Sequence, residues 1–355
     1  TDNDSPYNIY GGMQDNGSWR GPNTVWENGG IRNHHWEEVG FGDGFATLPL
    51  PQDSTKGYAM SQGGSVFRWD SVTGERRLIR PDGPQDMELR FNWNAAIALS
   101  PSDPENTLYY GSQYLHVSTD QGASWKTLSE DLTTNNKDWQ QQDKSGGLTP
   151  DVTAAENFCS IMSIAPSHLD PNVIWVGTDD GRLHVTRDGG QTFSSVEENV
   201  LGVNKNTWVP HVEASRHKAG TAYVVFDDHR RGDWTTQVFR TTDFGDNWTR
   251  IDSPVVDGYA HVIKEDPVDP KLLFLGTEFG LWVTTDGGKN WFKWTNGFPT
   301  VAVRALAIQE RESDLVIGTH GRAAYVIDDI SSLRGLSSEA LEQELHLFPV
   351  QDAQQ

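Results

Sequence analysis

One short motif recurs four times along the chain and constrains the fold more than any other feature of the sequence. The motif reads Ser/Thr-x-Asp-x-Gly-x-x-Trp/Phe, and its copies are "STDQGASW", "TRDGGQTF", "TTDFGDNW" and "TTDGGKNW". The aspartates near their centres are Asp120, Asp188, Asp243 and Asp286. Self-similarity of this kind is the signature of an architecture that repeats one structural unit. The fold must therefore be sought as a series of equivalent units.

Each motif lies inside a longer unit of strands and turns. Around Asp286 the unit contains "HVIKE", a turn rich in Pro and Asp, "LLFLGT", a short polar turn, and "GLWVT". Short β-rich runs that are bounded by turn residues indicate strands. In the motif, the aspartate accepts backbone N–H groups and the glycine supplies the positive φ that a tight turn needs. The four motif aspartates are therefore predicted to be structural turn residues and not catalytic ones.

The same order of strands and turns extends over segments whose motif is degenerate or absent. It yields seven units, at roughly 7–39, 41–81, 92–130, 157–197, 207–252, 258–296 and 301–330. Units of about 40 residues with four strands each are the blades of β-propellers. The sequence therefore predicts an all-β fold, a seven-bladed β-propeller at 1–335, with a polar loop at 131–156. The tail at 336–355 is predicted to contain a strand at 345–350, "LHLFPV".

The first unit differs from the others because no apolar segment precedes its Pro/Asp turn. Only "TDNDSP" stands before "YNIYGG", so the strand nearest the centre of the ring has no counterpart in this unit. An unpaired strand exposes backbone donors and acceptors. We therefore expect sequence upstream of Thr1 to complete this blade, with the segment at 345–350 as the alternative.

The charge and the residue composition of the chain disfavour several classes of partner and site. The formal net charge of −22 disfavours nucleic acid, whose phosphates need Lys and Arg, and it equally disfavours anionic membrane surfaces. The single cysteine, Cys159, excludes an internal disulfide and a cysteine-based zinc site. No apolar run reaches the ~18 residues of a membrane-spanning helix, and no cofactor is expected.

Several phrases of the sequence resemble large bacterial secreted proteins with sortilin-like BNR repeats, also called Asp-box repeats. These phrases are "YNIYGGMQDNGSWRGP", "RFNWN", "GTEFGLWVTTDGGKNW" and "GTHGRAAYVIDDIS", and the likeness covers nearly the whole chain. Such proteins are often labelled glycosyl hydrolases. The resemblance implies a propeller fold, a secreted, periplasmic or cell-surface location, and an upstream propeller in the same polypeptide. Because propellers host unrelated functions, the function must be argued from the site.

Asp-box repeats also occur in sialidases, in sortilin-type receptors and in tandem-propeller endoglucanases that cleave xyloglucan. A sialidase would need an arginine triad and an early Arg-Ile-Pro element; the sequence has no Arg-Ile-Pro, and sialidase activity is not expected. The endoglucanases that the chain resembles place catalytic aspartates from two propellers across a cleft. The chain offers one propeller, so that mechanism would need a partner domain.

The turns between the second and third strands are predicted to lie on the face opposite the motif turns, which we call the polar face. The groups that these turns bring are Gln14, Asp15, Gln62, Gln113, Asp179, Asp180, Asp227, Asp228, His229, Glu278, His320 and Arg322. The loops that lead into the innermost strands reach the same face and bring Asp43, Asn92, Trp93, Asn94, Asn157, Trp208, His211, His261 and Arg304. Amides and carboxylates hydrogen-bond sugar hydroxyls, and indole rings cover the apolar face of a pyranose. The polar face is therefore predicted to bind the ligand.

Each of these groups also has a structural interpretation. The acids of the "GTDDG" and "GTEFG" turns can accept hydrogen bonds from their own backbone. His211, His261 and His320 can be ordinary residues that line a channel. Together with Asp228 and Glu278 they could also hold a metal, yet no short ligand spacing supports this and no metal site is predicted.

Two functions remain open. The first is a secreted carbohydrate-active propeller that binds or hydrolyses a polysaccharide, with a pair of carboxylates as acid and base. The candidate catalytic residues are Asp43, Asp179, Asp228 and Glu278. The second is a non-catalytic module that binds peptide, protein or glycan through the same face, as sortilin-type propellers do.

Overall fold

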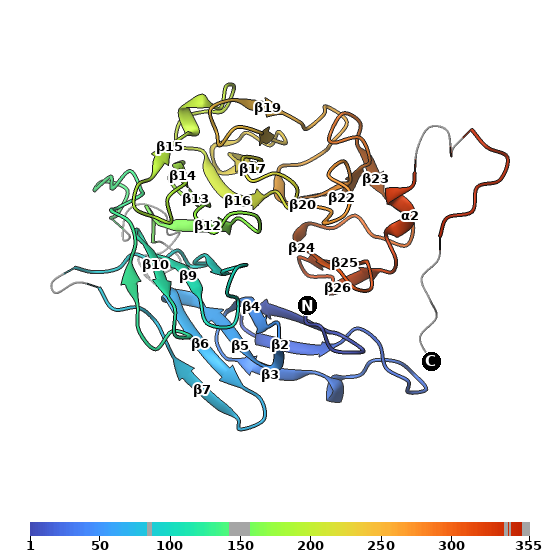
Figure 1. Cartoon of the computed structure of the whole chain (residues 1–355), viewed down its shortest axis with the longest axis horizontal. Coiled ribbons are helices and arrows are strands. Elements are labelled where there is room, and N and C mark those ends of the chain that lie inside the picture. Colours follow the sequence, from blue (N-terminus) through green and yellow to red (C-terminus); the bar gives the residue numbers. More distant parts are fainter. Residues whose placement is uncertain (84–86, 142–156, 337–339, 341, 350–355) are drawn as a thin grey trace.

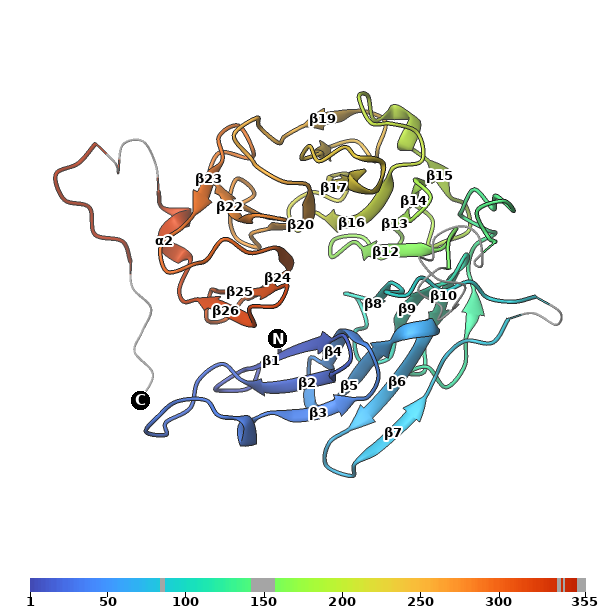
Figure 2. The ribbon, with the colours of Figure 1, turned by 180° about the vertical axis from the view of Figure 1, so that it is seen from behind.

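The computed structural model describes residues 1–83, 87–141, 157–336, 340 and 342–349. In this part of the chain, seven sheets are arranged as a ring around a central channel, as Figures 1 and 2 show. The protein is a seven-bladed β-propeller, as the repeat predicted. The predicted polar loop is described only as far as residue 141, and that part of it contains no strand.

The strands follow the chain from blade to blade, with the first strand of a complete blade nearest the channel. Blades one to three contain β1 (Asn8–Met13), β2 (Gly17–Pro22), β3 (Glu37–Gly40), β4 (Gly44–Leu50), β5 (Asp53–Ser61), β6 (Ser65–Asp70), β7 (Glu75–Leu78), β8 (Ile97–Leu99), β9 (Leu108–Gly111), β10 (Leu115–Ser118) and β11 (Lys126–Thr127). Blades four and five contain β12 (Ile161–Pro166), β13 (Ile174–Thr178), β14 (Leu183–Thr186), β15 (Ser194–Ser195), β16 (Trp208–Ala214), β17 (Ala222–Asp227), β18 (Val238–Thr241) and β19 (Trp248–Arg250). Blades six and seven contain β20 (Ala260–Glu265), β21 (Leu273–Thr277), β22 (Gly280–Thr284), β23 (Phe292–Trp294), β24 (Val303–Gln309), β25 (Asp314–Thr319) and β26 (Ala324–Ile327).

The hydrophobic core lies between neighbouring blades. Between blades four and five, Trp175 of β13 belongs to one buried cluster with Val224 and Phe226 of β17. Between blades five and six, Tyr223 of β17 shares a second cluster with Ile263 of β20. Full burial of a side chain such as Phe226 stabilises the fold by about 1.5–3 kcal/mol. Each blade therefore depends on its neighbours for most of its apolar contacts.

The four motif turns, which we call the aspartate turns, have the hydrogen bonds that the sequence predicted. In blade six, Asp286 Oδ1 accepts from the Thr284 hydroxyl at 2.8 Å and from the Asn290 N–H at 2.9 Å. Gly288, with φ of 88°, donates its N–H to the Thr284 hydroxyl. The same hydroxyl and backbone contacts surround Asp120, Asp188 and Asp243.

The aspartate turns also fasten each blade to the preceding one. A Cβ added at Gly288 would lie 2.9 Å from the Cβ of Ile251, at the end of blade five. In the same turn Trp291 donates its indole N–H to the Ile251 carbonyl at 2.7 Å. In blade three, Trp125 makes the equivalent bond to the carbonyl of Ile79. These turns therefore position whole blades as well as strands.

The seam between blades seven and one is closed largely by side chains. Both blades have three strands among the described residues. The Tyr7 hydroxyl donates to Asp314 at 2.9 Å in a buried hydrogen bond, and Gln309 Nε2 donates to the carbonyl of Asp2 at 3.0 Å. In the described part of the chain, blade one therefore meets blade seven through these side-chain contacts.

After blade seven the chain forms α2 (Ser331–Arg334), which Arg334 fixes through an ion pair with the buried Asp266 at 2.9 Å. Residues 345–349 do not form the strand expected at 345–350, and position 350 lies outside the described residues. Phe348 instead lies against Gly335, and the side chains of Leu345 and Leu347 are exposed. None of the described helices is long and apolar enough to cross a membrane.

Candidate functional site

The polar face is built from the turns that join the second and third strands of each blade and from the loops that lead into the innermost strands. Gln62 lies between β5 and β6, Gln113 between β9 and β10, and Asp179 directly after β13. Asp228 follows β17 and Glu278 follows β21. The predicted ring of polar groups therefore lies at the ends of the blades opposite the aspartate turns.

Three of the turn residues in this ring hydrogen-bond to the backbone of their own blade. Gln62 Oε1 accepts the N–H of Asp43 at 2.7 Å, and Gln113 Oε1 accepts the N–H of Arg90 at 2.8 Å. Asp179 accepts the N–H of Ser160 at 2.8 Å. In each case the side chain ties the turn to the loop that leads into the innermost strand of the same blade.

Asp179 is the most buried of these three side chains. Its side chain accepts the Ser160 hydroxyl at 2.5 Å and Asn92 Nδ2 at 2.9 Å, and the residue has no exposed surface. Burial, assisted by the charge of Asp180, raises the pKa of Asp179 to about 7. Asp180 is equally buried and accepts from the hydroxyl groups of Thr134 and Thr178. The hydrogen bonding of this acidic pair is that of structural residues.

Asp228 and Asp43, two further candidate catalytic acids, also have hydrogen-bond partners within the protein. Asp228 is 4% exposed, accepts Asn204 Nδ2 at 2.9 Å, and forms an ion pair with Arg231. Asp43 accepts the N–H of Asp15 at 2.9 Å, which joins blade two to the exposed β1–β2 turn. The catalytic assignments of Asp43, Asp179 and Asp228 stay predictions, and their contacts favour a role in holding the polar face together.

Glu278 differs from the other acids because its partners are side chains that could meet a ligand. Its Oε2 accepts from His261 Nε2 at 3.0 Å, and the side chain is 28% exposed. Although burial opposes ionisation, the hydrogen bonds from His261 and Tyr259 hold the pKa of Glu278 below its ordinary value. Burial lowers the pKa of His261 to about 4, so the ring is neutral at pH 7. His261 therefore donates through Nε2–H and accepts through Nδ1, which Arg304 Nη1 approaches at 3.3 Å.

Next to Glu278, aromatic rings follow one another across blades four to six. Trp208 lies 5.7 Å from Phe158, which lies 5.9 Å from Trp139. In blade five, His229 stacks on Tyr259 at 4.2 Å, and Trp234 lies 5.5 Å from Tyr259. Arg230, next to His229 in the chain, holds its guanidinium 3.8 Å from the Trp208 ring and joins the two groups. We call these residues the aromatic strip; its members are Trp139, Phe158, Trp208, His229, Arg230, Trp234 and Tyr259.

The aromatic strip combines apolar ring surface with fixed hydrogen-bonding groups. Trp234 is 56% exposed, and its ring meets the buried Tyr259 ring edge-on at an interplanar angle of 70°. His229 bonds Asp227 Oδ1 through Nδ1 at 2.6 Å, which directs its Nε2 away from Asp227. Burial and the hydrogen bond to Glu278 raise the pKa of Tyr259 to about 12, so the hydroxyl stays a donor at pH 7. Such a surface suits a ligand with C–H faces and hydroxyl groups.

Sequence reasoning found Trp208, His229, His261 and Glu278 but missed most of the strip. A signal existed for Trp234, because the segment between β17 and β18 runs from 228 to 237, whereas the equivalent turn of blade four runs from 179 to 182. An insertion in a repeat marks a loop that has been extended for contact. Trp139 lies in the predicted polar loop at 131–156, which is a comparable insertion, whereas Phe158 and Tyr259 carried no such signal.

The remaining predicted residues are spread around the ring. Gln14, Asp15, Asn94, His320 and Arg322 are exposed on turns of blades one, three and seven. Asn92 is engaged by Asp179. His211 lies in the channel wall, where its Nε2 bonds the carbonyl of Ile263 at 2.8 Å. The structure therefore does not bring the predicted residues together into one site.

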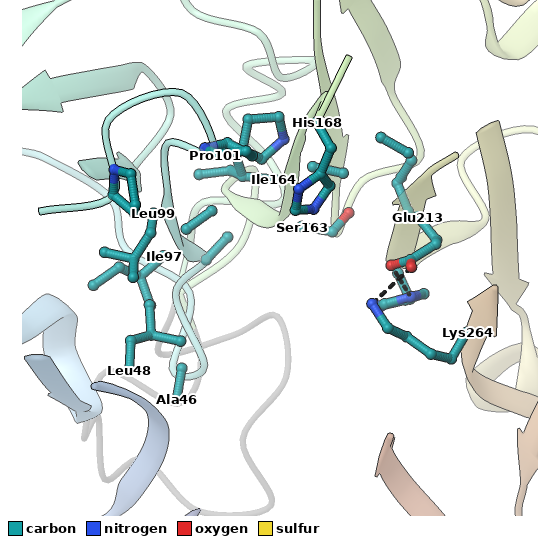
Figure 3. A pocket seen from close by; sticks show the side chains of 18 of the residues that line it. Ala46, Leu48, Ile97, Leu99, Pro101, Ser163, Ile164, His168, Glu213 and Lys264 are labelled. Atoms are coloured by element: carbon teal, nitrogen blue, oxygen red, sulfur yellow. Dashed lines mark hydrogen bonds and ion pairs between the residues drawn. The ribbon is translucent and has the colours of Figure 1, made fainter. Parts of the chain in front are cut away.

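The central channel holds a cavity of about 960 Å³, which is apolar on one side and charged on the other. In Figure 3, Ala46, Leu48, Ile97 and Leu99 form an apolar wall on one side. On the other side Lys264 and Glu213 form an ion pair at 2.7 Å. The channel carries few groups that are free to recognise a sugar, whereas the aromatic strip carries several.

One cluster of the described residues has the composition of a metal site. Ligand atoms of Glu27, His34 and His35, beside the 3-10 helix at Asn33–His35, lie within 4.8 Å of one another. The N–H of Arg32 donates to His35 Nδ1 at 2.9 Å, so the proton of a neutral ring sits on Nε2, the atom that faces Glu27. Binding a metal through that atom would require a different tautomer and the loss of the Arg32 bond. The cluster does not include any histidine that the sequence singled out for a metal.

The fold is a seven-bladed β-propeller, and known proteins can be compared on that basis. No family model matches the chain. An oligoxyloglucan-reducing end-specific xyloglucanase from Emericella nidulans is 23% identical over 243 residues, which are 63% of this chain and 26% of that protein. The chain therefore spans about a quarter of the length of this curated relative.

Solved structures confirm the architecture. The GH74 xyloglucanase from Xanthomonas campestris matches with a TM-score of 0.61 and 18% identity, over 89% of this chain and 49% of that one. An ancestral GH74 enzyme matches with a TM-score of 0.56 and 18% identity, over 79% of this chain and 36% of that one. YCF48 bound to D1 peptide matches with a TM-score of 0.54 and 12% identity, over 91% of this chain and 97% of that one. At these identities the likeness establishes the fold.

Proposed function

We propose that this propeller binds a polysaccharide along the aromatic strip and does not hydrolyse it by itself. The observation that carries the proposal is the run of rings from Trp208 to Trp234, beside the neutral His261 and the ionised Glu278. The rings can cover successive sugar faces while the carboxylate and imidazole bond the hydroxyl groups. The xyloglucanase names of the curated relative and of the Xanthomonas structure make a β-glucan such as xyloglucan the first ligand to test. A polymer of this kind places the protein outside the cell, as the sequence resemblance also implies.

The proposal favours binding over hydrolysis because the described residues include no free pair of carboxylates at the strip. A glycosidase needs a proton donor and a second carboxylate on opposite sides of the scissile bond. Near the strip, Asp227 is paired with His229 and Asp228 with Arg231. Asp233 accepts from Thr235, Asp257 is paired with Lys293, and Glu278 accepts from His261. Hydrolysis would therefore need a carboxylate that is not engaged in these contacts.

The binding experiment compares tryptophan variants by affinity electrophoresis and by calorimetry with xyloglucan. Trp234→Ala and Trp208→Ala should each weaken binding about tenfold, which corresponds to about 1.4 kcal/mol of lost stacking. Trp26→Ala is the matched control, because Trp26 is 91% exposed on the β2–β3 connection, away from the polar face. The proposal would be contradicted if Trp26→Ala and Trp234→Ala weakened xyloglucan binding equally, or if the folded parent did not bind xyloglucan.

Hydrolysis is tested separately by release of reducing ends from xyloglucan. We expect no release by the purified chain, and no difference between the parent and Glu278→Gln. Sustained release that Glu278→Gln abolishes would show that the chain hydrolyses the polymer by itself.

A peptide is the second candidate ligand. The chain covers 97% of YCF48 in the structure of YCF48 bound to D1 peptide. Arg230 and Arg304 could then receive acidic side chains of the peptide beside the same rings. Binding of an acidic peptide that Trp234→Ala removes, with no affinity for any polysaccharide, would favour this alternative.

A further inference from the structure

We propose that Glu27, His34 and His35, on the connection between β2 and β3, bind a divalent transition-metal ion such as Zn²⁺. The inference is independent of the aromatic strip, because this connection lies at the end of blade one opposite the polar face. It follows from the way the chain folds back here, from the distances between three ligand atoms, and from a buried ring nitrogen that has no hydrogen-bond partner.

The backbone of the connection brings the acid and the two histidines together. The N–H of Gly30 donates to the carbonyl of Glu27 at 3.1 Å, and this turn reverses the chain. Gly29 and Gly30 have φ of 105° and 71°, in the left-handed region that favours glycine. The returning chain then forms the short 3-10 helix that carries His34 and His35. The side chain of Glu27 is thereby set beside both rings.

The end of the 3-10 helix is fixed to blade one. A Cβ added at Gly21 of β2 would lie 2.5 Å from the ring of Trp36, so the indole packs directly on the strand. The N–H of Trp36 also donates to the carbonyl of Asn33 at 3.1 Å. The two histidines therefore lie between a closed turn and an anchored tryptophan. A site that is organised in this way loses less conformational entropy when a ligand binds.

Three ligand atoms face one another beside the turn. His35 Nε2 lies 3.2 Å from Glu27 Oε1, and His34 Nε2 lies 3.7 Å from Glu27 Oε2. One ligand atom from each residue lies within 4.8 Å of the other two. In a tetrahedral zinc site, whose bonds are about 2.0–2.1 Å long, neighbouring ligand atoms are about 3.4 Å apart. The cluster therefore has nearly the spacing that a zinc ion needs.

The hydrogen bonding of His35 favours a bound ion. Its Nε2 is buried and has no aligned hydrogen-bond partner among the described residues. A metal ion would give this atom a partner, while the ring proton would move to Nδ1. The cost is the bond that the Arg32 N–H makes to Nδ1, but Arg32 is exposed, so water can become the acceptor for this N–H. The exchange satisfies a buried atom and gives up a bond that water can replace.

The donor set selects the class of ion. Two imidazole nitrogens and one carboxylate oxygen suit Zn²⁺, Ni²⁺ and Cu²⁺, whereas Mg²⁺ and Ca²⁺ prefer ligands that are all oxygen. The side chains of His34 and Glu27 are 63% and 56% exposed, so water can reach the fourth position of a tetrahedral ion. An ion held in this way would join the two arms of the connection between β2 and β3.

The test is a calorimetric titration of the untagged protein with zinc chloride. We expect saturable binding at this cluster and no comparable heat from magnesium chloride. Glu27→Gln and His35→Gln should each weaken zinc binding by at least about tenfold, because even the loss of a group that only orients a metal ligand costs that much. Both changed residues lie outside the sheets, so the propeller should still form. His346→Gln, which changes an exposed histidine of the tail, is the control and should bind zinc as the parent does.

The ring nitrogens of His35 give a second readout by NMR, and His35→Gln identifies their signals. We expect saturating zinc to convert the ring from the form protonated on Nε2 to the form protonated on Nδ1. A merely structural role of His35 would leave its protonated nitrogen unchanged.

Three results would overturn the proposal. Absence of saturable zinc binding would mean that the cluster does not hold an ion. Equal zinc affinity of the parent, Glu27→Gln and His35→Gln would mean that zinc binds elsewhere on the chain. A His35 ring that stays protonated on Nε2 at saturating zinc would mean that this nitrogen is not a ligand.

Discussion

At the scale of single residues, the polar face divides into side chains whose hydrogen bonds are already used and side chains that remain available. Gln113 bonds the backbone N–H of Arg90, and Asp179 bonds the backbone and hydroxyl of Ser160 and the side chain of Asn92. Trp234 projects from the surface with 56% exposure, and Glu278 keeps a partly exposed carboxylate. Ligand contact is therefore expected from the second group, while the first group sets the shape of the face.

The structural role of Asp179 can be tested through the pH dependence of the free energy of unfolding. Its pKa is raised from 3.8 to about 7 in the folded protein by burial and by Asp180. The folded state therefore binds a proton that the unfolded state has released, and the free energy of unfolding should fall as pH rises across this interval. Asp179→Asn, which keeps the shape of the side chain, should remove this part of the slope. Urea unfolding at several pH values between these limits measures it.

The control for the lost charge is Asp246→Asn, because Asp246 is exposed in a turn of blade five. This variant should keep the parental pH dependence. If Asp179→Asn and the parent lost the same free energy of unfolding as pH rises from 3.8 to about 7, the claim that the pKa of Asp179 is raised would be contradicted.

At the scale of strands and turns, the sequence was a reliable guide wherever the determining contacts are local. The aspartate turns are closed by hydrogen bonds between residues such as Thr284, Asp286 and Asn290, which lie within one short segment. The alternating runs and Pro/Asp turns between them fix strand order within each blade. These features predicted seven blades without any long-range information.

The site was less predictable because it depends on contacts between blades. The aromatic strip joins Phe158 of blade four, Trp208 and Trp234 of blade five, and Tyr259 of blade six. Nothing in the local sequence of any one of them indicates its neighbours. The tail illustrates the same limit, since the alternating apolar residues from 345 predicted a strand, and residues 345–349 do not pair with any sheet.

Substitution of the aspartate in one aspartate turn should destabilise the fold without changing the affinity for the ligand. Asp286→Ala leaves the Thr284 hydroxyl and the Asn290 N–H without their acceptor. We expect a loss of about 1–3 kcal/mol in the free energy of unfolding and unchanged polysaccharide affinity of the folded protein. Asp246→Ala, on the exposed surface, should change stability by less than about 0.5 kcal/mol. Loss of affinity in a folded Asp286→Ala protein would contradict a purely structural turn.

At the scale of the whole molecule, the ring depends on close packing at each seam between blades. A Cβ at Gly12 would meet the backbone of Gly44 and Phe45 at 2.1 Å, whereas a Cβ at the neighbouring Gly11 would meet nothing within 4 Å. Gly12→Ala should therefore lower the free energy of unfolding by about 1–3 kcal/mol through overpacking. Gly11→Ala should be close to neutral, and thermal denaturation of the two variants compares them directly. Equal stability would contradict the packing of β1 against β4.

The central claim is that the propeller takes its ligand on the aromatic strip of the polar face. The most direct measurement is a crystal structure with a bound xyloglucan oligosaccharide, collected at a ligand concentration near the solution dissociation constant. The account predicts sugar rings stacked on Trp208 and Trp234, with hydroxyl groups bonded to Glu278 or His229. A sugar bound instead at the aspartate turns, or inside the channel beside Glu213 and Lys264, would contradict it.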